Sequence, residues 1–97
     1  MEMTIHYLIC YDIADDERRD DIATLLSGYG PRVQLSVFEC EVATRTAAAE
    51  LRGKLRALID PVEDQVRMYL LGDRAPHGLV VIGARTIEER QDFWIIA

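Results

Sequence analysis

Hydrophobic residues gather in four segments that predict strands. Ile5–Tyr11 is dense in aliphatic, aromatic and β-branched residues, which is typical of a strand buried on both faces. Apolar and polar residues alternate along Arg32–Val42, and this pattern predicts a second strand. The runs Val66–Leu71 and Leu79–Ala84 predict two further strands, joined by a turn over residues 72–78.

Two segments between these strands show the spacing of an amphipathic helix. The first is expected to begin at Asp15 or Asp16, because either side chain can cap it, and to end at Gly28. The second is expected to begin at Thr44 or Thr46 and to end before an Asp-Pro pair. Their apolar stripes consist of Ile22, Leu25, Leu26 and Tyr29 in the first helix and Ala47, Ala48, Leu51, Leu55, Leu58 and Ile59 in the second.

The predicted order is strand, helix, strand, helix, strand, strand and a short apolar strand at Phe93–Ile96. This is the ferredoxin-like β-α-β-β-α-β order with one strand displaced. It predicts one α+β domain over residues 1–97, an antiparallel sheet with both helices on one face. Leu8, Cys10 and Phe38 make the other face too apolar for water, so a two-fold copy is expected to cover it. The segment from about residue 86 to 97 is expected to pack on that partner.

Charge and cysteine content narrow the classes of function. The net charge of −6 disfavours non-specific binding to a polyanion, so a nucleic-acid site has to be a local patch. Arg45, Arg52 and Arg56 form one candidate patch on the second helix, and a solvated helix face is the default alternative. Cys10 and Cys40 lack the spacing of a metal or redox pair and are expected to be free buried thiols. With no secretory signal and no membrane-spanning run, a cytoplasmic protein is expected.

Asp12 is the first candidate for chemistry, because it ends a buried strand at the mouth of a loop. A single carboxylate is not enough to hydrolyse a phosphodiester efficiently. Two copies of Asp12 facing each other across a dimer would offer Mg²⁺ the hard oxygen ligands it prefers. The metal would then polarise a phosphate and lower the pKa of a bound water. The alternative is that Asp12 merely ends the strand or braces the turn.

Three arginines and two residues of the second predicted strand are candidates for nucleic-acid contacts. Arg18 and Arg19 open the first helix and Arg32 begins the second strand. Arginines in such places often bind phosphate, but pairing with the neighbouring aspartates is the alternative. Ser36 has the chemistry to bond a phosphate and Phe38 to stack on a base. A packed sheet face is the alternative for both.

Three blocks of the sequence resemble the CRISPR-associated protein two family. They occur in the family's order and spacing, from the first strand to about Leu71. The blocks are Tyr11-Asp12-Ile13 with Asp16 and Arg18-Arg19, then Tyr29-Gly30 with Arg32-Val33-Gln34 and Ser36-Val37-Phe38-Glu39, and then Leu58-Ile59-Asp60-Pro61 with Glu63-Asp64 and Val66-Arg67-Met68-Tyr69.

The resemblance implies a ferredoxin-like homodimer that acts in CRISPR spacer acquisition, as the central adaptor between two dimers of the CRISPR integrase. It also implies a Mg²⁺-dependent endonuclease acting on single-stranded RNA or double-stranded DNA. Asp12 would be its catalytic and metal-binding residue, supplied by both subunits. The positions that the family associates with its nuclease site or nucleic-acid contacts match Tyr11, Arg18 or Arg19, Arg32, Ser36 and Phe38.

Four functions follow as hypotheses: a metal-dependent phosphodiesterase, a non-catalytic scaffold, a toxin-like ribonuclease of related fold, and a small-molecule sensor. The sensor ranks last because the chain has no glycine-rich ligand loop. The scaffold is favoured as the cellular role, with nuclease activity as an intrinsic property. Asp12→Asn discriminates the first two, because it abolishes hydrolysis and leaves a scaffold intact.

Overall fold

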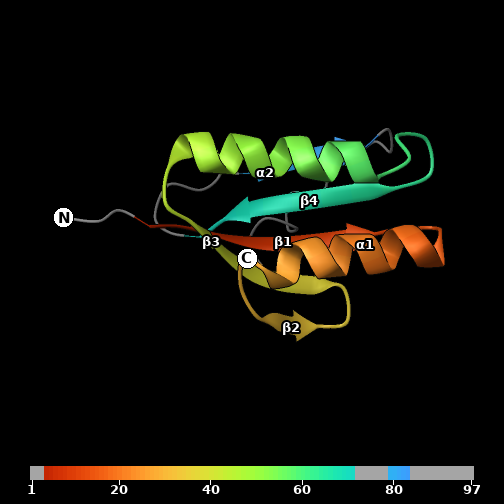
Figure 1. The fold of residues 1–97 in the computed structure, drawn as a ribbon, viewed down its shortest axis with the longest axis horizontal. Coiled ribbons are helices and arrows are strands. Elements are labelled where there is room, and N and C mark those ends of the chain that lie inside the picture. The colour runs from red at the N-terminus through yellow and green to blue at the C-terminus, as the bar shows by residue number, and fades with distance from the viewer. Residues whose placement is uncertain (1–3, 72–78, 84–97) are drawn as a thin grey trace, which may run out of the picture.

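The computed structural model describes residues 4–71 and 79–83. Over these residues the chain forms a five-stranded sheet and two helices (Figure 1). The predicted turn over 72–78, the predicted strand Phe93–Ile96 and the segment 86–97 lie outside the described residues. The elements are β1 (Ile5–Asp12), α1 (Asp16–Ser27), β2 (Arg32–Gln34), β3 (Val37–Val42), α2 (Arg45–Leu58), β4 (Gln65–Leu70) and β5 (Leu79–Gly83).

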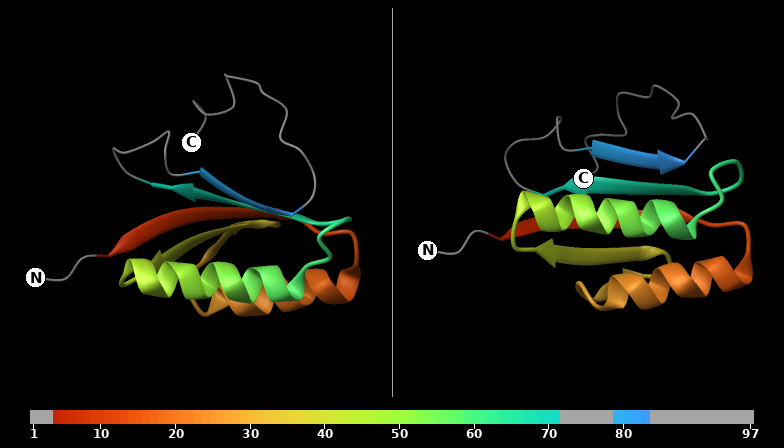
Figure 2. Two further views of the ribbon diagram at one scale, coloured as in Figure 1. Left: turned by 90° about the horizontal axis from the view of Figure 1, so that it is seen from above. Right: turned by 45° about the horizontal axis from the view of Figure 1, so that its top comes forward.

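The sheet has the order β2-β3-β1-β4-β5, and every neighbouring pair is antiparallel. Both helices cover the same face of this sheet (Figure 2). The predicted ferredoxin-like class is therefore confirmed. In this arrangement β1 is the central strand, so it is hydrogen-bonded to β3 along one edge and to β4 along the other.

The prediction of one strand over Arg32–Val42 is wrong. A turn at Leu35-Ser36 divides this segment into β2 and β3, which pair with each other as a hairpin. Folding back lets β2 bond to β3, and Leu35 is left 81% exposed at the turn. The order of elements is then β-α-β-β-α-β followed by β5, so the displaced strand of the sequence prediction does not exist.

The predicted caps position both helices. The Asp15 side chain accepts a hydrogen bond from the Arg18 backbone N–H (3.0 Å), and the Thr44 hydroxyl accepts one from Ala47 N–H (3.0 Å). Each bond satisfies one of the N–H groups that a helix leaves unpaired at its start. Gly28 caps the end of α1 as predicted. Ile22, Leu26, Ala48, Leu51 and Leu55 are buried against the sheet.

The hydrophobic core lies between the helices and the sheet. Along β1, Tyr7, Ile9 and Tyr11 are buried on the helix side. Phe38 is also buried there, with 2% exposure, so its predicted place on the opposite face is wrong. The turn before β3 sets the strand's register, which pairs Phe38 with Ile9.

The opposite face is called the helix-free face here, because α1 and α2 lie on the other side of the sheet. By strand alternation and register it carries Leu8, Cys10 and Asp12 of β1, with Glu39 of β3 and Arg67 of β4 beside them. Leu8 and Cys10 are half-buried and Asp12 is exposed. The expected apolar residues of β1 are therefore present on this face, next to charged ones.

Cys10 and Cys40 are free thiols as predicted, but only Cys40 is buried as expected. They lie on opposite faces of the sheet, since Cys40 is buried among the core residues and Cys10 is half-buried on the helix-free face. Within the described part of the chain, neither helix is long and apolar enough to cross a membrane.

Candidate active site

Four segments meet at the end of the sheet where β1 stops (Figure 1). They are the end of β1, the start of α1, the turn between β2 and β3, and the loop between α2 and β4. Antiparallel pairing brings them together, because β1 ends where β3 and β4 begin. Most of the predicted site residues lie here, but they divide between the two faces of the sheet.

Asp12 is the last residue of β1 and lies opposite Gln65 of β4. It is exposed, whereas the preceding Tyr11 is buried against the helices. Alternation along the strand therefore directs Asp12 to the helix-free face. A carboxylate at this place is presented by a rigid strand and stays accessible to a ligand.

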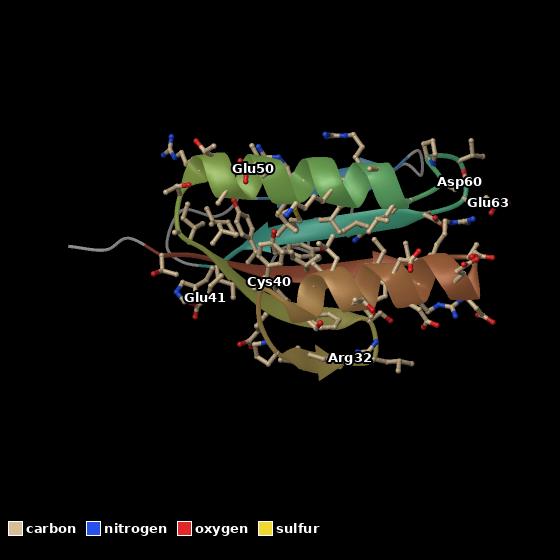
Figure 3. All side chains as sticks on the ribbon, viewed as in Figure 1. Arg32, Cys40, Glu41, Glu50, Asp60 and Glu63 are labelled. Atoms are coloured by element: carbon tan, nitrogen blue, oxygen red, sulfur yellow. The ribbon has the colours of Figure 1, made fainter. Side chains whose placement is uncertain are left out.

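Tyr11, Arg32 and Phe38 form one stacked cluster on the helix side. The rings of Tyr11 and Phe38 are stacked with their centroids 6.3 Å apart. The Arg32 guanidinium lies 5.3 Å from the centroid of the Phe38 ring and donates a hydrogen bond to the Tyr11 hydroxyl (3.1 Å). Figure 3 shows Arg32 on β2 at the edge of the sheet. Phe38 is thus a core residue. This supports the alternative that its ring packs in the fold and not the hypothesis that it stacks on a base.

Ser36 lies in the turn beside the end of β1. Its backbone carbonyl accepts a hydrogen bond from Tyr11 N–H (3.1 Å), and the Tyr11 hydroxyl donates to the carbonyl of Leu35 (3.4 Å). Both ends of the Tyr11 residue are therefore attached to this turn. The arrangement holds Ser36 near Asp12 through the backbone.

Arg18 binds acidic residues of the loop before β4. Its Nε donates to Oδ2 of Asp64 (2.8 Å) and its Nη2 donates to Oε1 of Glu63 (3.1 Å). Glu63 and Asp60 are labelled in this loop in Figure 3. Arg18 is therefore paired with acidic residues, but the expected pairing with the neighbouring aspartates is wrong, because both partners come from a distant segment.

Asp64 is a charged residue with 0% exposure. Burial raises the pKa of its carboxyl, but hydrogen bonds from Arg18 and from the backbone N–H groups of Ala14 and Asp60 outweigh burial, and the pKa lies below its ordinary value. In return, the bond to Asp64 raises the pKa of Arg18. Both groups are therefore charged at neutral pH.

Arg19 is held within its own segment. Its Nη1 donates to Asp16 and its Nη2 donates to the carbonyl of Ile13 (3.0 Å). Bonding to Asp16 raises the pKa of Arg19. Ile13 directly follows Asp12 in the chain, so the bond from Arg19 to its carbonyl holds the backbone after Asp12 in place. Pairing with a neighbouring aspartate, the alternative predicted from the sequence, is therefore confirmed for Arg19.

Three polar residues of β4 complete the surroundings of Asp12 on the helix-free face. Arg67 lies opposite Cys10 and donates from Nε to Oε1 of Gln65 (2.9 Å) and from Nη1 to the Tyr69 hydroxyl (3.3 Å). These bonds fix the guanidinium along β4, diagonally across from Asp12. Burial raises the pKa of the Cys10 thiol, and the charge of Arg67 partly offsets this increase.

The side chains at this site meet only part of the needs of a divalent metal. Asp12 offers the oxygen ligand that Mg²⁺ accepts. Over residues 4–71 and 79–83, however, no group of three His, Cys, Asp or Glu side chains is placed to hold a metal ion. A metal at Asp12 therefore fits only if further ligands come from a second copy, from a phosphate or from water.

Comparison with known proteins decides the family. A sequence model of the family described as CRISPR associated protein Cas2 matches residues 3–76. The chain belongs to the Cas2 family. The match covers β1 to β4, and hence the whole of the candidate site.

Curated Cas2 proteins are similar over most of this chain. CRISPR-associated endoribonuclease Cas2 1 of Chloroflexus aurantiacus is 46% identical over 92 residues, which are 93% of this chain and 98% of the relative. CRISPR-associated endoribonuclease Cas2 3 of a Synechocystis strain is 49% identical over 65 residues, which are 67% of this chain and 70% of the relative. CRISPR-associated endonuclease Cas2 2 of Thermus thermophilus is 49% identical over 63 residues, which are 65% and 69% of the two chains.

Solved structures agree with this assignment. Streptococcus pyogenes Cas2, in a crystal structure at pH 6.5, is 36% identical and superposes with a TM-score of 0.63, covering 69% of this chain and 86% of that one. A chain in a structure titled partial Cas6-RT-Cas1–Cas2 complex is 32% identical with a TM-score of 0.62, covering 76% of this chain and 92% of that chain. The ferredoxin-like fold described above is therefore the Cas2 fold.

Asp64, Gln65 and Tyr69 were missed as site residues by sequence reasoning, although they stand in or beside a family block. One feature of the sequence could have indicated Asp64: it is an acidic residue directly before a buried strand. Its partner Arg18 is 46 positions away, so no local pattern links them. In this member of the Cas2 family, the loop before β4 is as much a part of the site's framework as the start of α1.

Proposed function

We propose that the protein works as a homodimeric adaptor in CRISPR spacer acquisition, where it binds the integrase Cas1 and carries DNA between Cas1 dimers. The observation that carries this proposal is the helix-free face. Half-buried Leu8 and Cys10 lie there beside charged Glu39, Asp12 and Arg67. Such a mixed apolar and charged face suits a second copy of the chain. Membership of the Cas2 family, and a related chain in a Cas1–Cas2 complex, support the Cas1 partner.

We also propose intrinsic endonuclease activity centred on Asp12, on RNA or double-stranded DNA. Relatives named endoribonuclease and endonuclease support this second function. Two copies that meet through the helix-free face would bring two Asp12 carboxylates together and supply the ligands that one chain lacks. When bound, Mg²⁺ would polarise a phosphate and lower the pKa of a water molecule. Asp12 itself would hold the cation at the end of a rigid strand.

The distribution of charge supports DNA binding along α2 and not along α1. The start of α1 carries Asp15, Asp16 and Glu17, which would repel a phosphate backbone. Arg45 and Arg56 are exposed on α2, and Arg52 is half-buried between them. Basic side chains on one helix can contact the phosphate backbone, so this helix is the proposed DNA-supporting surface.

Asp12→Asn separates the adaptor from the nuclease. Asn keeps the size of the side chain and removes its charge, so the variant should still form dimers, retain Cas1 in a pull-down and acquire spacers. It should lose metal-dependent cleavage of RNA and DNA. Asp20→Asn, an exposed aspartate on α1, is the matched control and should behave as the wild type.

Each outcome bears on one proposal. Failure of the wild type to bind Cas1 would contradict the adaptor function. Loss of spacer acquisition in a dimeric Asp12→Asn protein would show that Asp12 chemistry is part of the cellular role. Cleavage that persists in this variant, or that persists in EDTA, would contradict the proposed nuclease site and favour a toxin-like ribonuclease with another centre.

A further inference from the structure

We infer that Asp64 is the positioning residue of the Cas2 site in this protein: it fixes the backbone that follows Asp12 and the start of the strand opposite it, and Arg18 acts through it. This inference rests on the proposed function of Asp12. Asp64 is the fully buried charged side chain of the described core, and the proposed chemistry assigns it no task. A buried carboxylate is costly unless it is fully hydrogen-bonded, so its contacts are informative.

The Asp64 carboxylate joins three segments. Oδ1 accepts a hydrogen bond from Ala14 N–H (2.9 Å), and Oδ2 accepts one from Asp60 N–H (2.8 Å). Arg18 donates to both oxygens, from Nε to Oδ2 (2.8 Å) and from Nη2 to Oδ1 (3.3 Å). The β1–α1 loop, the start of α1 and the α2–β4 loop therefore converge on one side chain.

This junction lies next to Asp12, both along the chain and across the sheet. Ala14 is two positions after Asp12 in the chain, and Gln65, the neighbour of Asp64, is the β4 residue opposite Asp12 in the register. The backbone of Asp64 is also closely packed, because a Cβ added at Gly83 would lie 2.3 Å from the Asp64 carbonyl oxygen. Asp64 is therefore held by β5 through its backbone and by the loop after Asp12 through its side chain.

Arg18 has the geometry of a support and not of a phosphate ligand. Its guanidinium places Nε and Nη2 on the Asp64 carboxylate and shares Nη2 with Glu63. Such a two-pronged contact fixes the orientation of a carboxylate as well as its charge. A phosphate at Arg18 would have to compete with a buried anion. Arg18 therefore contributes to the site through the orientation of Asp64.

The test uses the full-length chain labelled with ¹⁵N, as wild type and as Asp64→Asn and Arg18→Lys. Glu63→Gln is the matched control, because it removes only the negative charge of the exposed partner of Arg18. Order parameters of the Asp12, Ile13 and Ala14 amides are measured without metal. Mn²⁺ is then titrated, and its binding is followed by line broadening at Asp12.

In the folded Asp64→Asn variant, order parameters at residues 12–14 should fall from about 0.85 to below about 0.6, while those of α2 stay unchanged. Affinity for Mn²⁺ should fall about tenfold, as is usual when the support of a metal ligand is lost. The Asp64 change should have no further effect on Mn²⁺ binding in the Asp12→Asn background. Glu63→Gln should match the wild type.

Wild-type order at residues 12–14 together with unchanged Mn²⁺ affinity in Asp64→Asn would overturn the inference. If Asp64→Asn does not fold, the same two measurements on Arg18→Lys decide it, since this variant keeps the charge and loses the two-pronged contact. If wild-type Asp12 shows no Mn²⁺ broadening, the proposed metal site fails, and the order parameters alone decide the positioning role. The two failures are thereby distinguished.

Discussion

Arg18 Nε donates a 2.8 Å hydrogen bond to Oδ2 of Asp64, a residue 46 positions later in the chain. This bond joins the start of α1 to the start of β4, next to the strand end that carries Asp12. The expected partners of Arg18 were four aspartates closer in the chain, Asp15, Asp16, Asp20 and Asp21. Arg18 instead pairs with the buried Asp64. The low dielectric around Asp64 strengthens the attraction, and hydrogen bonds from two backbone N–H groups offset the free-energy cost of burying its charge.

Replacing Asp64 by Ala should lower the free energy of unfolding by about 3 kcal/mol, since it leaves the Arg18 guanidinium and two backbone N–H groups without their acceptor. Urea unfolding followed by circular dichroism measures this change. Glu63→Ala, which removes only the exposed partner of Arg18, should cost far less. Equal losses for the two variants would show that burial of the Asp64 contact contributes nothing.

The contribution of Asp64 to stability should depend on pH. Its pKa in the folded protein lies below the ordinary value of 3.8, so the folded state binds the proton less readily than the unfolded state. The contribution is then complete above about pH 5 and is lost as the pH falls through the folded pKa. Asn resembles the protonated carboxyl, so the deficit of Asp64→Asn relative to wild type should be largest at neutral pH and should shrink below about pH 4. A deficit that grows in acid would contradict this sign.

Patterns within a single element were sufficient to predict much of this fold. Both helix starts, at Asp15 and Thr44, follow from capping chemistry, which acts within one turn. The turn at Leu35-Ser36 was missed because it contains no glycine, proline, asparagine or aspartate, and because alternation continues across it. What decides this turn is the pairing of β2 with β3, a tertiary contact that a local pattern does not encode.

The same difference between local patterns and tertiary contacts explains which residues of the candidate site were predicted. Asp12 was found because the end of a buried strand is visible in the sequence. Phe38 was assigned to the wrong face because its orientation depends on the missed turn. The Asp64 junction was not found, since a buried ion pair is formed by segments that only the folded chain brings together.

Gly30 should not tolerate a side chain, whereas Gly53 should. A Cβ at Gly30 would lie 1.8 Å from the Glu39 carbonyl oxygen, so Gly30→Ala forces the segment before β2 away from β3. At Gly53, in α2, a Cβ meets nothing within 4 Å, and Gly53→Ala should raise stability by about 0.5–1 kcal/mol through helix propensity. Thermal unfolding of the two variants gives the comparison. Similar midpoints for both would contradict the close approach at Gly30.

Phe38→Ala should destabilise the fold by about 3 kcal/mol, because the ring is 2% exposed and packs between Tyr11 and Arg32. Phe38→Leu, which keeps most of the volume, should cost less. Cleavage assays should therefore be normalised to the folded fraction from urea titrations. If Phe38→Leu is fully folded and still loses all cleavage of single-stranded RNA, a direct contact of the ring with a base would be indicated instead.

The two cysteines should report whether a second copy covers the helix-free face. Cys40 is buried in the core, where burial raises the pKa of its thiol to about 11, so it should resist a maleimide in the folded protein. Cys10 is half-buried on the helix-free face, and should react about tenfold faster when dilution separates the subunits than when they are paired. Mass spectrometry after timed labelling assigns the modified residue, and Cys10→Ser provides the background rate. If Cys10 reacts as fast in a sample that light scattering shows to be dimeric as in a dilute sample that it shows to be monomeric, the dimer forms through another surface.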